Sequence, residues 1–166
     1  MTHFLKDILR QPGELQRTID YLRGQDRSRL AEAVAVVQRS HHVYLTGVGS
    51  SWNVALRAGP LISQASCPVY LQDASKLLQF AAIPSGAVIL VISRTERNIE
   101  IVRLPAKARE CRGVVIGVTN SEDGALAQEA HTDCDRSQAR SWNFGQHIFH
   151  VSCRNRCSGQ RHRGYF

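Results

Sequence analysis

The sequence predicts an α/β fold in which a doubly wound parallel sheet follows an N-terminal helical arm. Short apolar runs alternate with stretches of helical periodicity from residue 41 to about residue 130. The apolar runs are continuous, as expected for strands that helices cover on both faces. The connections between runs and helices are short, which favours repeated βα units and an open parallel sheet.

Length and composition are consistent with this fold class. The chain has 166 residues, of which 43% are hydrophobic and 21% charged, as is typical of one globular domain. No apolar run approaches the ~20 residues that a membrane-spanning helix needs, and the N-terminus lacks the apolar stretch of a secretion signal. Five scattered cysteines without such a signal favour reduced thiols. We therefore expect a cytoplasmic protein with no membrane partner.

The N-terminal arm is expected to be helical. Apolar residues recur at helical spacing over residues 3–11, and Pro12 is expected to interrupt this helix. Because proline fits a first turn, a second helix is expected to begin there and to end near Gly24. A third helix is expected from about Arg27 to Val37, with Asp26 as its N-cap.

The α/β part follows as four strand–helix pairs. The strands are expected at 42–46, 68–71, 87–92 and 113–118, and their helices at 51–64, 74–80, 98–110 and 124–130. The domain organisation expected from this order is a helical arm over 1–40, one α/β domain over 41–135 and a tail over 136–166.

The tail differs from the rest of the chain in composition. It carries six arginines and no acidic residue, so six of the chain's seven net positive charges belong to it and the remainder has a net charge of +1. A nearly neutral domain gives no reason to expect specific binding of nucleic acid. With little apolar surface to offset the entropy of ordering, residues 136–166 are expected to be mostly irregular. A slipped reading frame would also produce an abrupt change in composition at this point. Comparison of the coding DNA in all three frames would test this hypothesis.

The tail also offers two alternative functions. His147, His150, Cys153 and Cys157 are of the ligand types that suit zinc, but their spacing matches no zinc finger, so adventitious binding is favoured over a structural metal site. Its arginines would bind nucleic acid without specificity. A solvated or aberrant tail is the interpretation we favour over both.

The strongest functional pattern is the loop that follows the first strand. Gly49, Ser50 and Ser51 lie between that strand and the start of the next helix. Unpaired amides of a first helical turn, the positive end of the helix dipole and two hydroxyls converge there. We interpret this loop as one half of a phosphate site.

Polar residues also follow the third and fourth strands. In the flavodoxin-like strand order 2-1-3-4-5, ligands bind between the first and third strands, at their carboxyl ends. Neutral donors with limited positive charge suit a phosphate monoester. The third strand supplies Ser93, Arg94, Thr95 and Asn98 for the phosphate, and the fourth supplies Thr119, Asn120 and Ser121 for the sugar side.

Two other interpretations of these loops remain open. Gly47 and Gly49 are also the first two glycines of a dinucleotide-binding fingerprint, with Asp73 as the ribose ligand, but Trp52 replaces the third glycine. Ordinary turn and N-cap chemistry also places serine and threonine at helix starts.

The order of these motifs resembles the sugar isomerase (SIS) domain family. A Gly-x-Ser-Ser loop follows strand one, Ile-Ser-Arg-Thr follows strand three and Val-Thr-Asn follows strand four. The start, Phe-Leu-Lys-Asp-Ile to Gln-Pro, is similar to that of the isomerase half of the glucosamine-6-phosphate synthases, and the resemblance covers roughly residues 4–135. It implies that Ser51, Ser93 and Thr95 contact the phosphate of a hexose or amino-sugar 6-phosphate, with Asn98 at the last hydroxyl position. It also implies a homodimer, and chemistry that needs no metal or other cofactor.

The chain departs from the family in the loop after the third strand, where Asn98 also replaces the usual threonine or serine, and in its length. The family usually has Ser-Gly where this chain has Thr95-Glu96, and Glu96 adds a Cβ and a negative charge near the anion. Family isomerases carry two such domains, and the second supplies most of the acid and base groups. The resemblance therefore implies a truncated ketose/aldose isomerase, or a glucosamine-6-phosphate synthase- or deaminase-like protein, without catalysis by this chain alone. The alternative is a non-catalytic sugar-phosphate sensor or regulatory SIS module.

Overall fold

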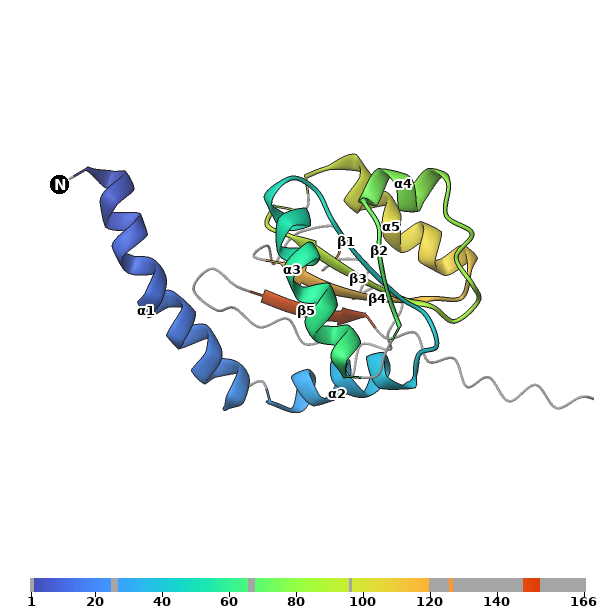
Figure 1. The fold of residues 1–166 in the computed structure, drawn as a ribbon, viewed down its shortest axis with the longest axis horizontal. Helices are drawn as coiled ribbons and strands as arrows, with labels where there is room; N and C mark the ends of the chain where they lie inside the picture. The colour runs from blue at the N-terminus through green and yellow to red at the C-terminus, as the bar shows by residue number, and fades with distance from the viewer. Residues whose placement is uncertain are drawn as a thin grey trace, which may run out of the picture.

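The computed structural model describes residues 2–24, 27–65, 68–95, 97–119, 126 and 148–152. Helices and strands alternate through most of this range (Figure 1). In chain order the elements are α1 (His3–Arg23), α2 (Arg27–Arg39), β1 (Val43–Gly47), α3 (Ser50–Gln64), β2 (Val69–Leu71), α4 (Ala74–Gln79), β3 (Val88–Ser93), α5 (Ile99–Glu110), β4 (Val114–Thr119) and β5 (Ile148–Ser152).

One sheet of strand order β2-β1-β3-β4-β5 organises the α/β part. Strands β1 to β4 are parallel, and β5 pairs antiparallel with β4. The four parallel strands and the helices between them confirm the α/β fold and the 2-1-3-4 order that the sequence predicted.

Helices cover the parallel strands on both faces. Val43, Val88 and Ile116 face a core to which α2 contributes Val36 and Val37. The neighbouring strand positions face a second core, formed with α4 and α5, whose members include Tyr44, Ile89, Val91, Leu77 and Leu104. Successive strand residues point to opposite faces, so burial on both faces explains why the strand sequences are continuously apolar.

The N-terminal arm differs from the prediction at Pro12. Two helices were expected to meet there, but α1 is one helix that continues through this residue. Proline lacks the N–H that would bond to the carbonyl of residue 8, so the helix loses one backbone bond there. The helical turns on either side keep their own backbone bonds, and the two expected helices therefore join end to end.

The tail also differs in part from the prediction. Residues 136–166 were expected to be mostly irregular, yet Ile148–Ser152 forms the edge strand β5 beside β4. The run contains isoleucine, phenylalanine and valine, which have high strand propensity. The rest of the tail, Asp26 and all but Leu126 of the helix expected at 124–130 lie outside the described residues. Leu126 is helical and buried.

None of the helices in the described part of the chain combines the length and apolar character that a bilayer span requires.

The end of β1 packs closely against α3 and β3 at Gly47. A Cβ built on this residue would lie 2.9 Å from the carbonyl carbon of Ser51 and 3.0 Å from the carbonyl oxygen of Ile92. Both contacts are with backbone atoms, which cannot rotate away as a side chain would. The absence of a side chain at Gly47 therefore allows the first turn of α3 to lie directly against the ends of two strands.

We predict that Gly47→Ala destabilises the chain by about 1–3 kcal/mol, because the added methyl group overpacks this junction. Urea denaturation of the parent and the variant measures the difference in the free energy of unfolding. Gly13→Ala in α1 is the matched control, since its Cβ would have no atom within 4 Å, and it is expected to cause no loss. Equal stability of Gly47→Ala and the parent would contradict the prediction.

Candidate functional site

The carboxyl ends of three parallel strands are aligned at one edge of the sheet. In the pairing of β1 with β3, Gly47 lies opposite Ile92, and in the pairing of β3 with β4, Ser93 lies opposite Thr119. The loops that follow these strands therefore begin side by side, although about 45 residues separate the first from the second along the chain.

The first loop ends in a glycine that begins α3. Gly49 is the N-cap residue, with φ of 61°, a conformation that glycine adopts at no steric cost. Its carbonyl oxygen accepts from the amide of Trp52 at 3.1 Å. Because glycine has no side chain, no side-chain hydrogen bond caps α3. The start of α3 is thus left open to an outside acceptor, with Ser50 exposed and Ser51 half-buried beside it.

The second loop begins at a buried serine and ends at the start of α5. Ser93 is buried at the end of β3, whereas Arg94 and Thr95 are exposed. Asn98 is the N-cap residue of α5, yet its side chain makes no capping hydrogen bond, although asparagine is among the preferred capping residues.

The other two helices with described N-caps differ in this respect. Thr2 Oγ1 accepts from the amide of Leu5 at the start of α1, and Asp73 Oδ1 accepts from the amide of Ser75 at the start of α4. The two helices that begin beside the ends of β1 and β3 are therefore the ones without side-chain caps. An anion between them would meet open amides and the positive ends of two helix dipoles.

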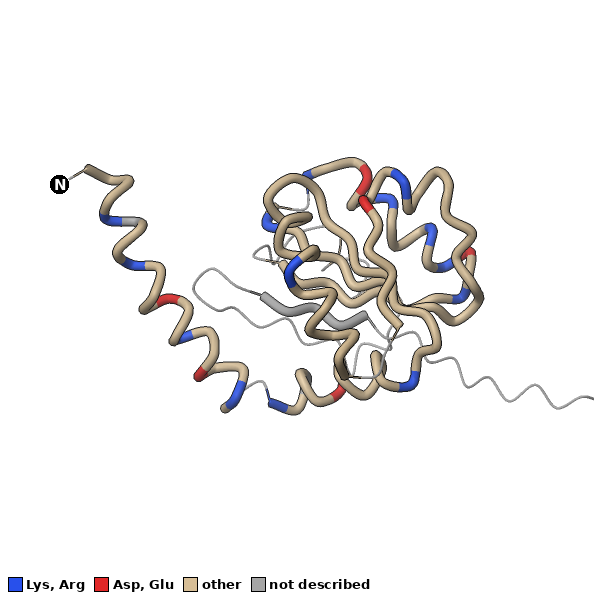
Figure 2. Tube along the Cα trace, in the orientation of Figure 1, with Lys and Arg blue, Asp and Glu red and all other residues tan. Residues whose placement is uncertain are grey.

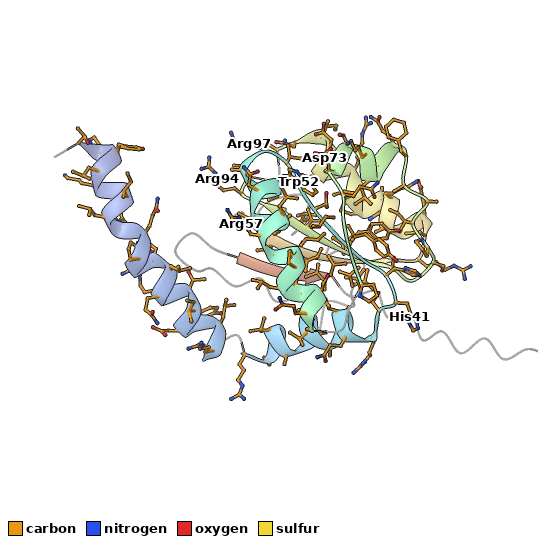
Figure 3. The ribbon with its side chains drawn as sticks, in the orientation of Figure 1. His41, Trp52, Arg57, Asp73, Arg94 and Arg97 are labelled. Carbon is orange, nitrogen blue, oxygen red and sulfur yellow. The ribbon has the colours of Figure 1, made fainter. Side chains whose placement is uncertain are left out.

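Basic side chains lie at the same end of the molecule. Figure 3 shows Arg94, Arg97 and Trp52 near the start of α3, with Arg57 further along this helix and His41 at the opposite end. The three arginines are exposed. Their cationic groups add limited positive charge to an edge at which the neutral donors are hydroxyls and amides.

Three buried hydroxyl side chains lie beneath these loops. Thr46, Ser93 and Thr119 are buried polar residues, and strand register places all three on the sheet face that α5 covers. Thr46 Oγ1 has no hydrogen-bond partner within the described ranges. These hydroxyls make the buried layer below the strand ends polar on this face of the sheet.

A family model described as the SIS domain matches residues 36–142, well over half of the chain. This chain belongs to the SIS domain family. The assignment agrees with the parallel sheet, the open helix starts and the motif order described above.

Two relatives and one solved structure illustrate the range of the family. The isomerizing glutamine–fructose-6-phosphate aminotransferase 1 of Arabidopsis thaliana is 26% identical over 141 residues, which cover 78% of this chain and 21% of that protein. The HTH-type transcriptional regulator HexR of Escherichia coli (strain K12) is 32% identical over 116 residues, covering 68% of this chain and 40% of HexR.

The structure of tagatose-6-phosphate ketose/aldose isomerase from Escherichia coli has the same fold as this SIS domain. It superposes with a TM-score of 0.63 at 23% identity, covering 75% of this chain and 36% of the isomerase. This SIS domain therefore spans well under half the length of each of these three proteins.

The structure brings most of the predicted site residues to one edge of the SIS domain. Asn120, Ser121 and Glu96 lie outside the described residues, so their predicted places stay predictions. The residues that meet around the ends of the strands are Gly49, Ser50, Ser51, Ser93, Arg94, Thr95, Asn98 and Thr119.

Two features of this edge, Arg97 and Thr46, are not among the predicted site residues. Arg97 lies in the loop that follows β3. Its position three residues after Arg94 indicates a second positive charge in the same loop. Thr46 had no such signal, because a threonine inside a strand is unremarkable until its burial without a partner is known.

Asp73 was the ribose ligand of the alternative dinucleotide interpretation. In the structure its Oδ1 accepts from both the amide and the hydroxyl of Ser75, so the carboxylate caps α4. The hydrogen bond from the Ser75 hydroxyl is the main cause that lowers the pKa of Asp73. The close packing assigned to the third glycine of that fingerprint occurs here at Gly47 instead.

We predict a pH-dependent contribution of Asp73 to stability. Its folded pKa lies below the ordinary value of about 3.9, so the charged cap stabilises the fold above that pH and this contribution is lost as pH falls through the lowered pKa. Asp73→Ala should lose about 1 kcal/mol at pH 7, whereas Asp73→Asn retains a capping side chain that does not titrate.

Urea denaturation at a series of pH values from 7 to about 3 measures this difference. The stability of the parent relative to Asp73→Asn should fall as pH decreases. If the stability of the parent relative to Asp73→Asn instead rose as the pH fell, the charged carboxylate would not be stabilised by its capping hydrogen bonds.

Proposed function

We propose that this SIS domain binds a hexose or amino-sugar 6-phosphate, with the phosphate between the starts of α3 and α5. The observation that carries the proposal is that both helices begin without side-chain caps beside the aligned ends of β1 and β3. Such helix starts are favourable sites for phosphate. The fructose-6-phosphate in the name of the Arabidopsis relative supports a phosphorylated hexose as the ligand.

The proposed roles divide between the phosphate and the sugar of the ligand. Amides at the start of α3 and the hydroxyls of Ser51, Ser93 and Thr95 donate to phosphate oxygens, and Arg94 adds a positive charge. Gly49, Ser50 and Asn98 shape the two helix starts. Thr119, with Asn120 and Ser121, faces the sugar. No metal or other cofactor has a part in this binding.

We propose that this domain binds without catalysing a reaction by itself. The resemblance assigns most of the acid and base groups of sugar isomerases to a second SIS domain, and this chain has one match to the family model. The larger protein would be a ketose/aldose isomerase or a glucosamine-6-phosphate synthase- or deaminase-like enzyme. We further propose a cytoplasmic homodimer, with residues 41–135 as the binding domain, 1–40 as its helical arm and 136–166 as a tail.

Thermal melting with fructose 6-phosphate and glucosamine 6-phosphate tests the site. A ligand at about 100 times its Kd stabilises the folded chain by ~2.7 kcal/mol, which raises the melting temperature measurably. Ser51→Ala and Ser93→Ala each remove a hydrogen bond to a charged group, so we predict that each weakens binding by about 1.5–3 kcal/mol, or roughly 10- to 150-fold in Kd.

Ser63→Ala is the matched control for Ser51→Ala, because Ser63 is exposed near the other end of the same helix. It should bind like the parent. Inorganic phosphate serves as the control ligand, and the sugar phosphates should shift melting further. A cooperative transition that no sugar phosphate shifts would overturn the proposed site.

The second candidate is a regulatory domain that senses the same ligand. The observation in its favour is the 32% identity to HexR, which is named as a transcriptional regulator. Both candidates predict binding of the ligand and no turnover by this chain alone, so turnover by this chain would contradict both.

We predict that NMR of fructose 6-phosphate with a large amount of this chain detects no aldose phosphate, while melting shows that the ligand binds. We expect no turnover because the resemblance assigns most of the acid and base groups to a second SIS domain. A Ser93→Ala variant is the control for any signal that appears. Turnover by the parent that this variant abolishes would overturn both non-catalytic candidates and would show that one domain suffices for catalysis.

A further inference from the structure

A cleft opens at the end of the sheet opposite the proposed phosphate site. Its volume is about 430 Å³, within the range of small-molecule sites. One wall is the loop between α4 and β3, with Ala81, Ile83 and Ser85, and the other wall is the end of α5. The amide of Gly86 donates to the carbonyl oxygen of Cys111 at 3.1 Å and joins the two walls. Because these walls directly precede β3 and β4, the cleft lies at the amino ends of the strands.

The cleft is separate from the proposed phosphate site. Strand β3 (Val88–Ser93) runs between the two, and its six residues span about 20 Å. Ligands of open α/β sheets normally bind at the carboxyl ends of the strands. A ligand in this cleft would therefore occupy a second site, distinct from that of the sugar phosphate.

The charged residues of the cleft are mainly basic. Among its described lining residues, Lys107 and Arg112 are cations and Glu110 is a carboxylate, which gives a net charge of +1. Lys107 Nζ lies 3.6 Å from Glu110 Oε2, which is longer than a hydrogen bond, so N–H groups of the ammonium stay available to a ligand. Figure 2 shows basic positions along α5 and just beyond its end, on the side of the molecule away from α1.

The end of α5 does not oppose an anion, because carbonyl groups of its last turn already accept hydrogen bonds. The amides of Arg112 and Gly113 donate to the carbonyl oxygens of Arg109 at 3.1 Å and Ala108 at 2.8 Å, the two bonds of a Schellman motif. The Cys111 thiol donates to the same Ala108 oxygen at 3.3 Å. These bonds reduce the negative charge that free carbonyl groups would present at a helix end.

Arg112 has a backbone conformation that favours glycine. Its φ is 53°, and it is the only described residue other than glycine with a positive φ. It follows the C-cap residue Cys111, at the position where a Schellman motif usually has glycine. Backbone strain of this kind is typical of functional positions. Lys107 and Arg109 already place positive charge in the last turn, so interaction with the helix dipole does not require Arg112.

We infer that this cleft binds a small organic carboxylate with a short apolar chain. Lys107 and Arg112 would bind the carboxylate, because a guanidinium group matches its two oxygens. The exposed Ser85 hydroxyl is a further donor on the opposite wall. Ala81 and Ile83 are half-buried and pack against the core, so they offer an apolar surface to the chain of the ligand. The inference goes beyond the proposed function, since none of these residues belongs to the phosphate site.

NMR of the ¹⁵N-labelled chain tests the site. Hexanoate is the probe, and hexanamide, which has the same chain without the charge, is the control ligand. We predict that hexanoate shifts the amide signals of residues 85–87 and 107–113 in a saturable manner. Hexanamide lacks the charge and inorganic phosphate lacks the apolar chain, so neither should do so.

Two variants test the assigned residues. Lys107→Met and Arg112→Gly each remove a charged donor, so we predict that each raises the Kd for hexanoate roughly 10-fold or more. Arg112→Gly should not lower the melting temperature, because relief of strain at the positive φ offsets the greater freedom of glycine in the unfolded chain. Loss of binding in this variant is therefore distinct from unfolding.

Arg103→Ala is the matched control, because Arg103 is exposed on α5 and is not among the lining residues of the cleft. It should bind hexanoate like the parent. Four results would overturn the inference. They are amide signals that hexanoate leaves unchanged, an equal response to hexanamide, parent-like binding by both cleft variants, and equally weakened binding by Arg103→Ala. The last result would show non-specific attraction to the basic helix.

Discussion

The close approach of three backbone segments at Gly47 is the constraint on which the candidate site depends. The end of β1, the first turn of α3 and the end of β3 meet where a single Cβ would collide with two of them. Because the segments are this close, the open start of α3 lies directly beside the loop that leaves β3. A wider junction would separate the backbone amide of Ser51 from the hydroxyl of Ser93.

Most of the fold and of the site follows from patterns that are local in the sequence. Continuous apolar runs such as 87–92 predict buried parallel strands, and the register of a parallel sheet then places the strand ends together. The loop residues Gly49, Ser51 and Ser93 were therefore predicted from their position after strands. The same register explains why Thr119 lies opposite Ser93, although neither residue by itself indicates the other.

The features that the sequence did not predict depend on non-local contacts or on competition between local signals. At Pro12 a strong local signal for a helix end competes with apolar residues at helical spacing on either side of it. The helix continues through Pro12. The strand Ile148–Ser152 forms by pairing with β4, which lies about 30 residues away along the chain. Burial of Thr46 Oγ1 without a partner depends on how helices from other parts of the chain cover this face of the sheet, which no single segment encodes.

The missing caps connect stability with function. A capping side chain contributes about 1 kcal/mol, and this chain uses one on α1 and on α4. Asn98 begins α5 with a side chain able to cap, yet makes no such bond. Helices α3 and α5 thus lack the capping stabilisation that α1 and α4 have. An anion that accepted hydrogen bonds from both helix starts would supply a comparable stabilisation. Binding of phosphate would then stabilise the junction at Gly47, because the ligand would bond to both helix starts that flank it.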